Sequence, residues 1–333
     1  AYASIAVIMA LAVASLAACA GPVRLTPSPG ATVFVAGGRE GTVHRLDPST
    51  GHALGPPLPV PGSPRQLAPA PGGGLVVLSV TAERACRLHV LDLLGPTPGA
   101  RPEPREITPF PPGTVVTALA AADGPDGPVV YVGLWWGTAP ASSAGHGAVL
   151  AIDPATGTLL GRIELTGAPE RLVPAAAPGG AGQRLYAVEG TPGPDKRNPG
   201  LVGDPPTRWR MLTLDHAALT VTAAVPLDAD ADDAPPAIGV APGGAHLFVI
   251  VRAAGRRSAL RALDPATGVA GPATLLRGEA LGGLAVTHER VYVPDSLGQG
   301  VWVVDHRQGH LLNTVDVVGA GRGAIAITLS PPP

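Results

Sequence analysis

Charged side chains are scarce in this chain. Only 14% of the 333 residues are Asp, Glu, Lys or Arg, and the formal net charge is −2. A nucleic-acid-binding surface needs a concentration of positive charge that this balance does not supply. The chain is nevertheless 45% hydrophobic, which is enough apolar material for a large core. We therefore expect a globular protein with no nucleic-acid partner.

Cysteine is almost absent, with only Cys19 and Cys86 in the chain. Cys19 follows an apolar stretch, Ile5 to Ala18, that is too short and too rich in alanine for a membrane span. Such a stretch followed by small residues is typical of a secretory signal. Leu16-Ala17-Ala18-Cys19 resembles the lipobox of bacterial lipoproteins, which implies that Cys19 becomes the lipid-modified first residue of the mature chain. An ordinary buried helix and a plain signal peptide are the alternatives.

This interpretation divides the chain into a signal peptide with its lipobox, residues 1–19, and one exported domain, residues 20–333. The lipid on Cys19 would anchor the domain to a bacterial membrane, facing outside the cytoplasm. Cys86 would then have no partner within the chain, so the domain cannot depend on a disulfide. Burial and backbone pairing have to stabilise it.

A helical hydrophobic period is lacking after Pro22, whereas glycine (45) and proline (40) are abundant and favour turns. A β-rich run with a central aromatic recurs instead. The chain has only four Trp, four Tyr and three Phe, so five aromatics at equivalent places are not expected by chance. The copies are Val33-Phe34-Val35, Val130-Tyr131-Val132, Leu185-Tyr186-Ala187, Leu247-Phe248-Val249, Val291-Tyr292-Val293 and, with valine replacing the aromatic, Val76-Val77-Leu78.

Each copy is followed by an alternating strand that ends in aspartate, at Asp47, Asp92, Asp153, Asp215, Asp264 and Asp305. Three of these continue as Asp-Pro-Ser/Ala-Thr-Gly. Proline presets φ at one turn position, glycine permits positive φ at another, and aspartate can bond the backbone that follows it. The motif therefore predicts a hairpin turn.

A third strand follows the turn, as in Leu159 to Leu165, and a fourth ends in a Pro-Gly turn, as in Leu172 to Gly179. Four short strands in about 50 residues, repeated along the chain, are typical of β-propeller blades. We predict an all-β propeller of six four-stranded blades. Seven blades fit if a divergent unit lies between Leu93 and Pro128. Val23 to Gly30 and Ala324 to Ser330 both look like fourth strands, and one of them should clasp the ring.

The repeat resembles the YVTN-type β-propeller repeat, because an aromatic-Val strand, a Val-x-Val-Ile-Asp-x-x-Thr-Gly strand and a Pro-x-Gly turn follow one another. The resemblance implies an extracytoplasmic binding scaffold, a surface-layer protein or, in a few members, an enzyme. The segment from Val149 to Gly161 is also similar to the repeat of pyrroloquinoline-quinone propellers. That repeat ends in a tryptophan that docks neighbouring blades, and Gly161 stands at its place.

Two long connections, Gly133 to Gly147 and Glu189 to Arg208, join the same pair of strands in adjacent units. We therefore expect them on one face of the disc, where loops commonly bind ligands. Adjacent aromatics in the first could stack on a sugar or a partner, and the basic residues of the second could hold an anion. In the alternative interpretation of the first connection, one tryptophan is buried between blades and the other forms a lid over the central channel. In that of the second, the connection is a solvated loop. The candidate ligand-binding residues are Trp135, Trp136, His146, Lys196, Arg197, Arg208 and Trp209.

Asp228, Asp230 and Asp232 begin like a calcium loop, but glycine and glutamate are missing from the sixth and twelfth places. They are weak metal candidates beside the alternative of an acidic solvated turn. No catalytic motif or cofactor is predicted. We expect a monomeric, non-enzymatic scaffold for an unknown protein or small ligand. The alternative is a quinoprotein-like dehydrogenase or a lactonase-like hydrolase with its site at the central channel.

Overall fold

All regular structure in the described part of the chain is β. The computed structural model describes residues 32–37, 41–46, 53–70, 73–83, 85–93, 102–110, 114–124, 126–136, 146–176, 183–191, 208–215, 217–227, 236–241, 244, 246–253, 257–264, 269–276, 278, 280, 283–287, 289–295, 300–305, 310–316 and 324–330. Within these ranges there is no helix that could span a membrane. Cys19 and the segment before it lie outside them.

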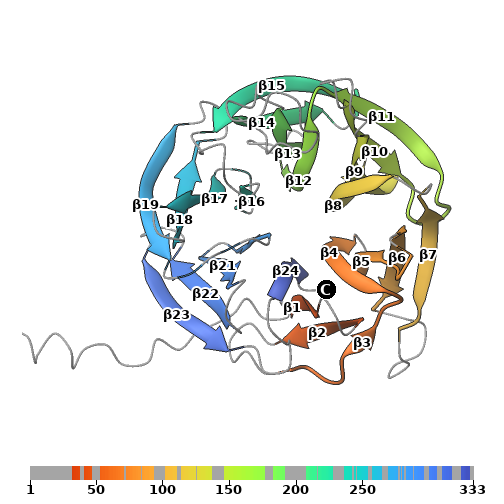
Figure 1. Ribbon diagram of the computed structural model, residues 1–333, viewed down its shortest axis with the longest axis horizontal. Helices are drawn as coiled ribbons and strands as arrows, with labels where there is room; N and C mark the ends of the chain where they lie inside the picture. The colour runs from red at the N-terminus through yellow and green to blue at the C-terminus, as the bar shows by residue number, and fades with distance from the viewer. Residues whose placement is uncertain are drawn as a thin grey trace, which may run out of the picture.

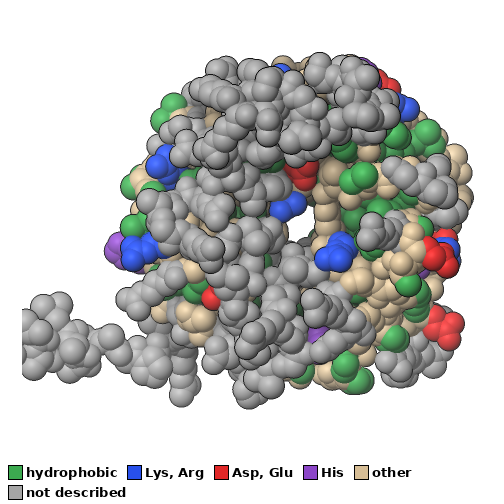
Figure 2. Space-filling view, viewed as in Figure 1, with side chains coloured by type: hydrophobic (Ala, Val, Ile, Leu, Met, Phe, Trp, Pro, Cys, Tyr) green, Lys and Arg blue, Asp and Glu red, His purple; other side chains and the backbone are tan. Residues whose placement is uncertain are grey.

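Six four-stranded antiparallel sheets surround a central opening (Figure 1). Side chains of both charges border this opening on the face seen in Figure 2. The prediction of an all-β, six-bladed propeller is thus confirmed. A seventh blade would need a divergent unit between Leu93 and Pro128. That region instead contains the outer strand of blade 2 and the inner strand of blade 3.

The strands of each blade run from the opening outwards, and Figure 1 shows this order. In blades 1 to 3 they are β24 (Ala324–Ser330), β1 (Thr32–Gly37), β2 (Thr42–Leu46), β3 (Leu58–Pro59); β4 (Ser63–Ala70), β5 (Gly74–Val80), β6 (Cys86–Asp92), β7 (Pro104–Pro109); β8 (Val115–Gly124), β9 (Gly127–Trp136), β10 (His146–Ile152), β11 (Leu159–Leu165). In blades 4 to 6 they are β12 (Ala168–Ala176), β13 (Gln183–Thr191), β14 (Arg208–Asp215), β15 (Thr220–Leu227); β16 (Ala237–Val240), β17 (Leu247–Ala253), β18 (Arg257–Leu263), β19 (Ala270–Leu276); β20 (Ala285–Val286), β21 (Arg290–Pro294), β22 (Gly300–Asp305), β23 (Leu311–Asp316).

The repeat and the sheet are out of phase by one strand. The aromatic strand was expected to begin each unit, but it is the second strand of each blade, and the strand before it is the innermost. In blade 2, for example, Ala70 at the end of β4 pairs with Gly74 at the start of β5. The Pro-Gly turn is therefore a hairpin within one sheet. The link between blades comes after the outer strand.

The ring is closed by the C-terminal strand, as one of the two expected alternatives has it. β24 pairs antiparallel with β1, from Thr32 opposite Ser330 to Gly37 opposite Ala324. Blade 1 thus combines one strand from the end of the chain with three from its beginning. The other candidate clasp, Val23 to Gly30, lies outside the described residues.

The core lies between successive blades. All five repeated aromatics are on second strands and are nearly inaccessible to solvent; they are Phe34, Tyr131, Tyr186, Phe248 and Tyr292. Each sheet packs its two faces against its neighbours, as separate buried clusters between blades 1 and 2, 2 and 3, 3 and 4, 4 and 5, and 5 and 6 show. Because a single sheet has no cover for either face, burial holds the blades together as a set.

The acidic motif forms the predicted hairpin turn where it is fully described, from Asp153 to Gly157. The Ala155 N–H donates to Asp153 Oδ1 at 2.8 Å and the Thr156 hydroxyl donates to Asp153 Oδ2 at 2.6 Å. These bonds, that from Thr156 first, lower the pKa of Asp153. Gly157 has φ of 76°, which only glycine adopts without strain. The turn therefore uses each residue of its motif.

Candidate functional site

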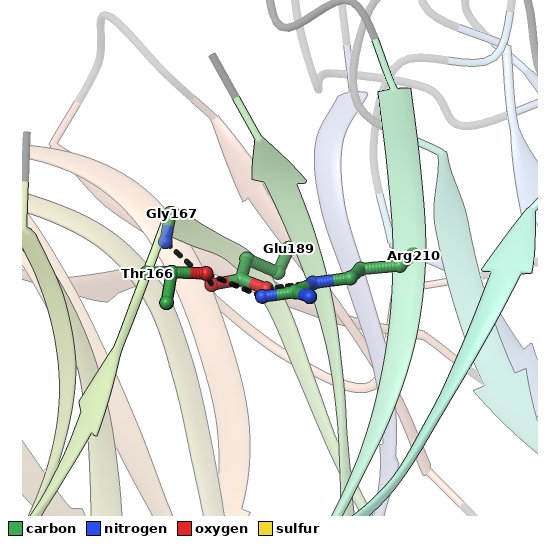
Figure 3. Close-up of polar contacts among 4 residues, drawn as sticks. All are labelled: Thr166, Gly167, Glu189 and Arg210. Carbon is green, nitrogen blue, oxygen red and sulfur yellow. Dashed lines mark hydrogen bonds and ion pairs between the residues drawn. The ribbon is translucent and has the colours of Figure 1, made fainter. Parts of the chain in front are cut away.

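A buried carboxylate locks blade 4 to the connection from blade 3 (Figure 3). Glu189, near the end of β13, is fully buried. It accepts hydrogen bonds from the Gly167 N–H at 2.5 Å and from the Thr166 hydroxyl at 3.2 Å. Arg210 on β14 forms an ion pair with Glu189 and also donates to Thr166 Oγ1. The four residues fill the gap between the two blades.

Blade 2 has the same positions with different residues. Ser79 pairs with Arg87 and with Pro64, as Glu189 pairs with Arg210 and with Pro169. In both blades a glycine lies two residues before that proline. A Cβ on Gly62 would lie 2.8 Å from the carbonyl oxygen of the residue after Ser79. A Cβ on Gly167 would lie 2.1 Å from the one after Glu189. The two corners of the fold are thus equivalent.

The replacements in blade 2 change the contacts of the corner. The Ser79 side chain ends two bonds closer to the backbone than a glutamate side chain does. Pro61 stands where blade 4 has Thr166. Arg87 therefore has no partner like Glu189 on β5. It turns to the outer strand instead and forms a 2.6 Å ion pair with Glu106 on β7. This ion pair involves the outer strand of its blade, whereas the pair of Glu189 and Arg210 joins the second and third strands.

A hollow of about 450 Å³ lies beside this corner, on the flank of blade 2 that faces blade 1. The outer strand of blade 1, β3, has only two residues, so it covers little of that flank. The lining combines apolar walls with side chains of both charges: Pro61, Thr81, Ala82, Glu83, Arg87, His89, Pro104 and Glu106. We call these eight residues the blade-2 hollow.

His89 forms the inner wall of the blade-2 hollow. Its side chain is 2% exposed and shares a 3.1 Å hydrogen bond between Nε2 and Ser79 Oγ. Its other ring nitrogen, Nδ1, is buried without a hydrogen-bond partner among the described residues. Burial lowers the pKa of His89, which the Glu106 carboxylate opposes and Arg87 reinforces. The imidazole is therefore neutral at pH 7 and adds no positive charge to the wall.

The described candidate residues that flank the first long connection do not line the hollow. Trp135 and Trp136 end β9 and are both half-buried, and His146 is exposed at the start of β10. Trp136 packs against the core between blades 2 and 3, and the Arg162 guanidinium lies 4.6 Å from the centre of its ring. This cation–π contact occupies one face of the indole. Neither tryptophan is enclosed completely, and neither covers the hollow.

Trp209 corrects an expectation. It lies within β14 and is 2% exposed, in the core between blades 4 and 5, because alternation turns it away from the Glu189 side of the sheet. Trp209 is therefore a core residue and has no free face for a ligand. Arg208 begins the same strand. Lys196, Arg197, Asp228, Asp230 and Asp232 lie outside the described residues.

Metal-binding side chains are not gathered in the described part of the chain, where no group of three His, Cys, Asp or Glu could hold an ion. Cys86 is a free, half-buried thiol. It packs against the core between blades 2 and 3, on the opposite face of β6 from His89. Its thiol therefore does not contribute to the blade-2 hollow.

The inner strands of blades 2, 3 and 4 share an irregularity near the central opening. Each has a register shift that leaves one residue unpaired, at Arg65, Thr117 and Glu170. The Thr117 hydroxyl donates to the Pro169 carbonyl at 2.6 Å, linking blade 3 to blade 4. Glu170 is half-buried, and burial raises its pKa although Arg171 opposes the shift. Bulges of this kind re-aim side chains at sheet edges.

The blade-2 hollow was not predicted from the sequence. Long insertions indicated blades 3 and 4, whereas the hollow lies in blade 2, which has no long connection between its second and third strands. The signal that could have found it is a comparison of repeats at one position. Glu189 and Arg210 form a pair in blade 4. At the equivalent positions of blade 2, Arg87 stands opposite Ser79, which is not an acid.

Comparisons with known proteins show the fold. No protein-family model matches the chain, and no curated protein matches it. Among solved structures, a chain of a nidogen/laminin complex is 14% identical with a TM-score of 0.58, covering 91% of this chain and 99% of that one. TolB from Acinetobacter baumannii is 12% identical with a TM-score of 0.54, covering 91% and 67%. Hydrazine synthase from Kuenenia stuttgartiensis is 18% identical with a TM-score of 0.52, covering 82% and 73%. Proteins of such different kinds have the propeller in common with this chain and do not indicate one activity.

Proposed function

We propose that this protein is an exported, lipid-anchored β-propeller that binds a small polar ligand in the blade-2 hollow. The observation that carries the proposal is the hollow itself. It holds about 450 Å³, and its inner wall is a buried imidazole with a ring nitrogen that lacks a partner among the described residues. Small-molecule sites are typically concave, mostly apolar, and equipped with a few polar groups. All the lining residues belong to one chain, so a monomer suffices.

The position of the hollow agrees with the expected binding face. Thr81, Ala82 and Glu83 belong to the connection between the second and third strands of blade 2. The long connections after Trp136 and Thr191 join the same pair of strands in blades 3 and 4. Because equivalent connections emerge on the same face of a propeller, all three belong to one face. A ligand in the hollow would therefore lie at the rim of that face.

Export and anchoring rest on the N-terminal sequence. Leu16-Ala17-Ala18-Cys19 resembles a lipobox after a short apolar stretch. In this proposal Cys19 carries the lipid and the propeller lies outside the cytoplasm, as the likeness to YVTN-type repeats also suggests. Labelling cells with a palmitate analogue tests the anchor, because Cys19→Ala should abolish the label. Equal label in both proteins would contradict it.

The ligand site is tested by filling the hollow. Ala82 is exposed and lines it, so Ala82→Trp should fill the space without disturbing the core. Ala217→Trp places the same side chain at an exposed turn before β15 and is the matched control. The three proteins are melted with a set of small cationic, anionic and neutral solutes. A ligand that binds only the folded state raises Tm.

We expect at least one class of solute to raise Tm of the unmodified protein and of Ala217→Trp, but not of Ala82→Trp. A shift that survives in Ala82→Trp would place binding elsewhere. No shift with any solute at millimolar concentration would contradict the function.

A hydrolase centred on the opening is the second candidate, and Glu170 favours it. Its raised pKa, on a strand that borders the opening, is a property of general acids. Hydrolysis of simple lactones between pH 5 and pH 8 is the assay, with Glu170→Gln as the comparison. Equal rates for the two proteins, or no rate above buffer, would remove this candidate.

A further inference from the structure

The blade-2 hollow presents more negative than positive charge. Arg87 is already paired with Glu106 at 2.6 Å, and both side chains remain about one-third exposed, at 38% and 34%. Glu83 is exposed and lines the hollow, and no ion pair of Glu83 is seen among the described residues. His89 is neutral for the reason given above. Among the described lining residues, one arginine therefore faces two glutamates.

The apolar part of the lining is suited to a hydrocarbon segment. Pro61, Ala82 and Pro104 provide carbon surface and no side-chain hydrogen-bond donor. The Thr81 hydroxyl and the two carboxylates supply acceptors. A ligand that fits this lining has a short aliphatic body and a charge-bearing donor at its end.

We propose that the ligand of the blade-2 hollow is a small organic ammonium ion, with its nitrogen at Glu83 and Glu106 and its methylene groups against the two prolines. This inference rests on the proposed function. An ammonium group donates three hydrogen bonds, and those to a carboxylate are charge-assisted. An anion would have to share Arg87 with Glu106 while approaching Glu83.

The comparison with blade 4 gives the contrasting case. There the equivalent corner holds its own carboxylate, Glu189, against Arg210 and a backbone N–H. The competing interpretation is therefore a carboxylate ligand that takes, in blade 2, the place that Glu189 has in blade 4. It would bind further N–H groups of the Arg87 guanidinium while lying close to Glu83 and Glu106. The two interpretations predict ligands of opposite charge.

The experiment compares n-butylammonium with butyrate by isothermal titration calorimetry on the full chain at pH 7 and low salt. The two ions have similar hydrocarbon bodies and opposite charge. Glu83→Gln removes a carboxylate that lines the hollow, and Glu103→Gln removes an exposed carboxylate that does not line the hollow. Far-UV circular dichroism checks that each variant is folded.

We expect n-butylammonium to bind and butyrate not to bind. Glu83→Gln should weaken the ammonium ion about tenfold, as the loss of one charge-assisted hydrogen bond does. Glu103→Gln should leave its affinity unchanged, and added salt should reduce it.

Binding of butyrate without n-butylammonium would overturn this inference and leave the proposed function standing. Equal weakening in Glu83→Gln and Glu103→Gln would overturn the assignment to the hollow. If neither ion binds while another solute raises Tm through the hollow, the ligand class is wrong. If no solute binds at all, the proposed function is wrong as well.

Discussion

At the scale of single residues, the two equivalent corners show how different side chains satisfy the same positions in two blades. Glu189 and Arg210 satisfy each other and the neighbouring backbone in blade 4. Ser79 in blade 2 satisfies only His89, and Arg87 has to find its carboxylate on the next strand. Buried charges require a partner because desolvation is costly. The acid therefore lies on the second strand in blade 4 and on the outer strand in blade 2.

Removing the buried acid should cost much stability. Glu189→Ala leaves the Gly167 N–H and Arg210 without their acceptor, and we expect the free energy of unfolding to fall by about 3 kcal/mol. The matched control is Glu164→Ala, which breaks a surface pair whose side chains are 44% and 64% exposed. That change should cost about 1 kcal/mol or less. Urea unfolding measures both, and equal losses would contradict the role of Glu189.

The buried histidine should make stability depend on pH. The pKa of His89 is lowered in the folded state, so between its unfolded value near 6.5 and its folded value the unfolded chain binds the proton first. Stability from this group is complete above pH 6.5 and is lost as pH falls, by at most about 1.4 kcal/mol per pH unit. We expect a shallower loss between pH 7 and pH 5.5 in His89→Gln. Parallel curves for the two proteins would contradict the prediction.

At the scale of strands, Gly161 and Leu219 show how neighbouring blades dock. Gly161 stands where the quinoprotein-like repeat has a tryptophan, and the side chain of Leu219 from blade 4 occupies the space above it. A Cβ on Gly161 would lie 2.0 Å from Leu219 Cδ1. Leu219 has φ of 52°, an uncommon value for a side chain of this size. Leucine from the next blade thus takes the place of the missing aromatic.

This contact predicts coupling between the two positions. Gly161→Ala should destabilise the protein by about 1–3 kcal/mol, because it crowds Leu219. The same change in a Leu219→Ala background should cost less, since the crowded atoms are gone. A double-mutant cycle by urea unfolding measures the difference. Additive effects would show that the two side chains do not compete for space.

The strands were largely predictable, and their assignment to blades was not. The aromatic runs and acidic turns recur locally, so the sequence alone indicates strand, turn and strand number. Which strand begins a sheet depends on hydrogen bonding across the Pro-Gly turn, as between Ala70 and Gly74. The same applies to register, because Val76 rather than Val77 stands at the aromatic position of blade 2, opposite Val90. The lining of the hollow comes from the link before β4, the connection between β5 and β6, β6 and β7, and only the fold brings these segments together. The sequence alone shows at most that Ser79 stands where blade 4 has its acid.

At the scale of the whole molecule, stability depends on the closed ring. β24 supplies the inner strand of blade 1 and pairs with β1 along nearly its whole length. A chain that ends at Asp316 would leave the edge of β1 unpaired. It would also uncover the parts of blades 2 and 6 that lie against β24. Exposed edges and apolar faces favour aggregation.

We expect that truncation to abolish the cooperative thermal transition and to give aggregates in size-exclusion chromatography. The matched control ends at Ser330, which keeps β24 complete. It should melt like the full chain. A truncated chain with the Tm of the control would show that the clasp is dispensable.

The clasp also determines the order in which the blades are completed during synthesis. Blade 1 contains the first described strands of the chain and one of the last, so it is the first blade to begin and the last to be finished. A ribosome that has made five blades has still made no complete circle, and a chain cut short anywhere upstream of Ala324 lacks the part that fastens it. The ring is therefore completed at one place, where β24 pairs with β1.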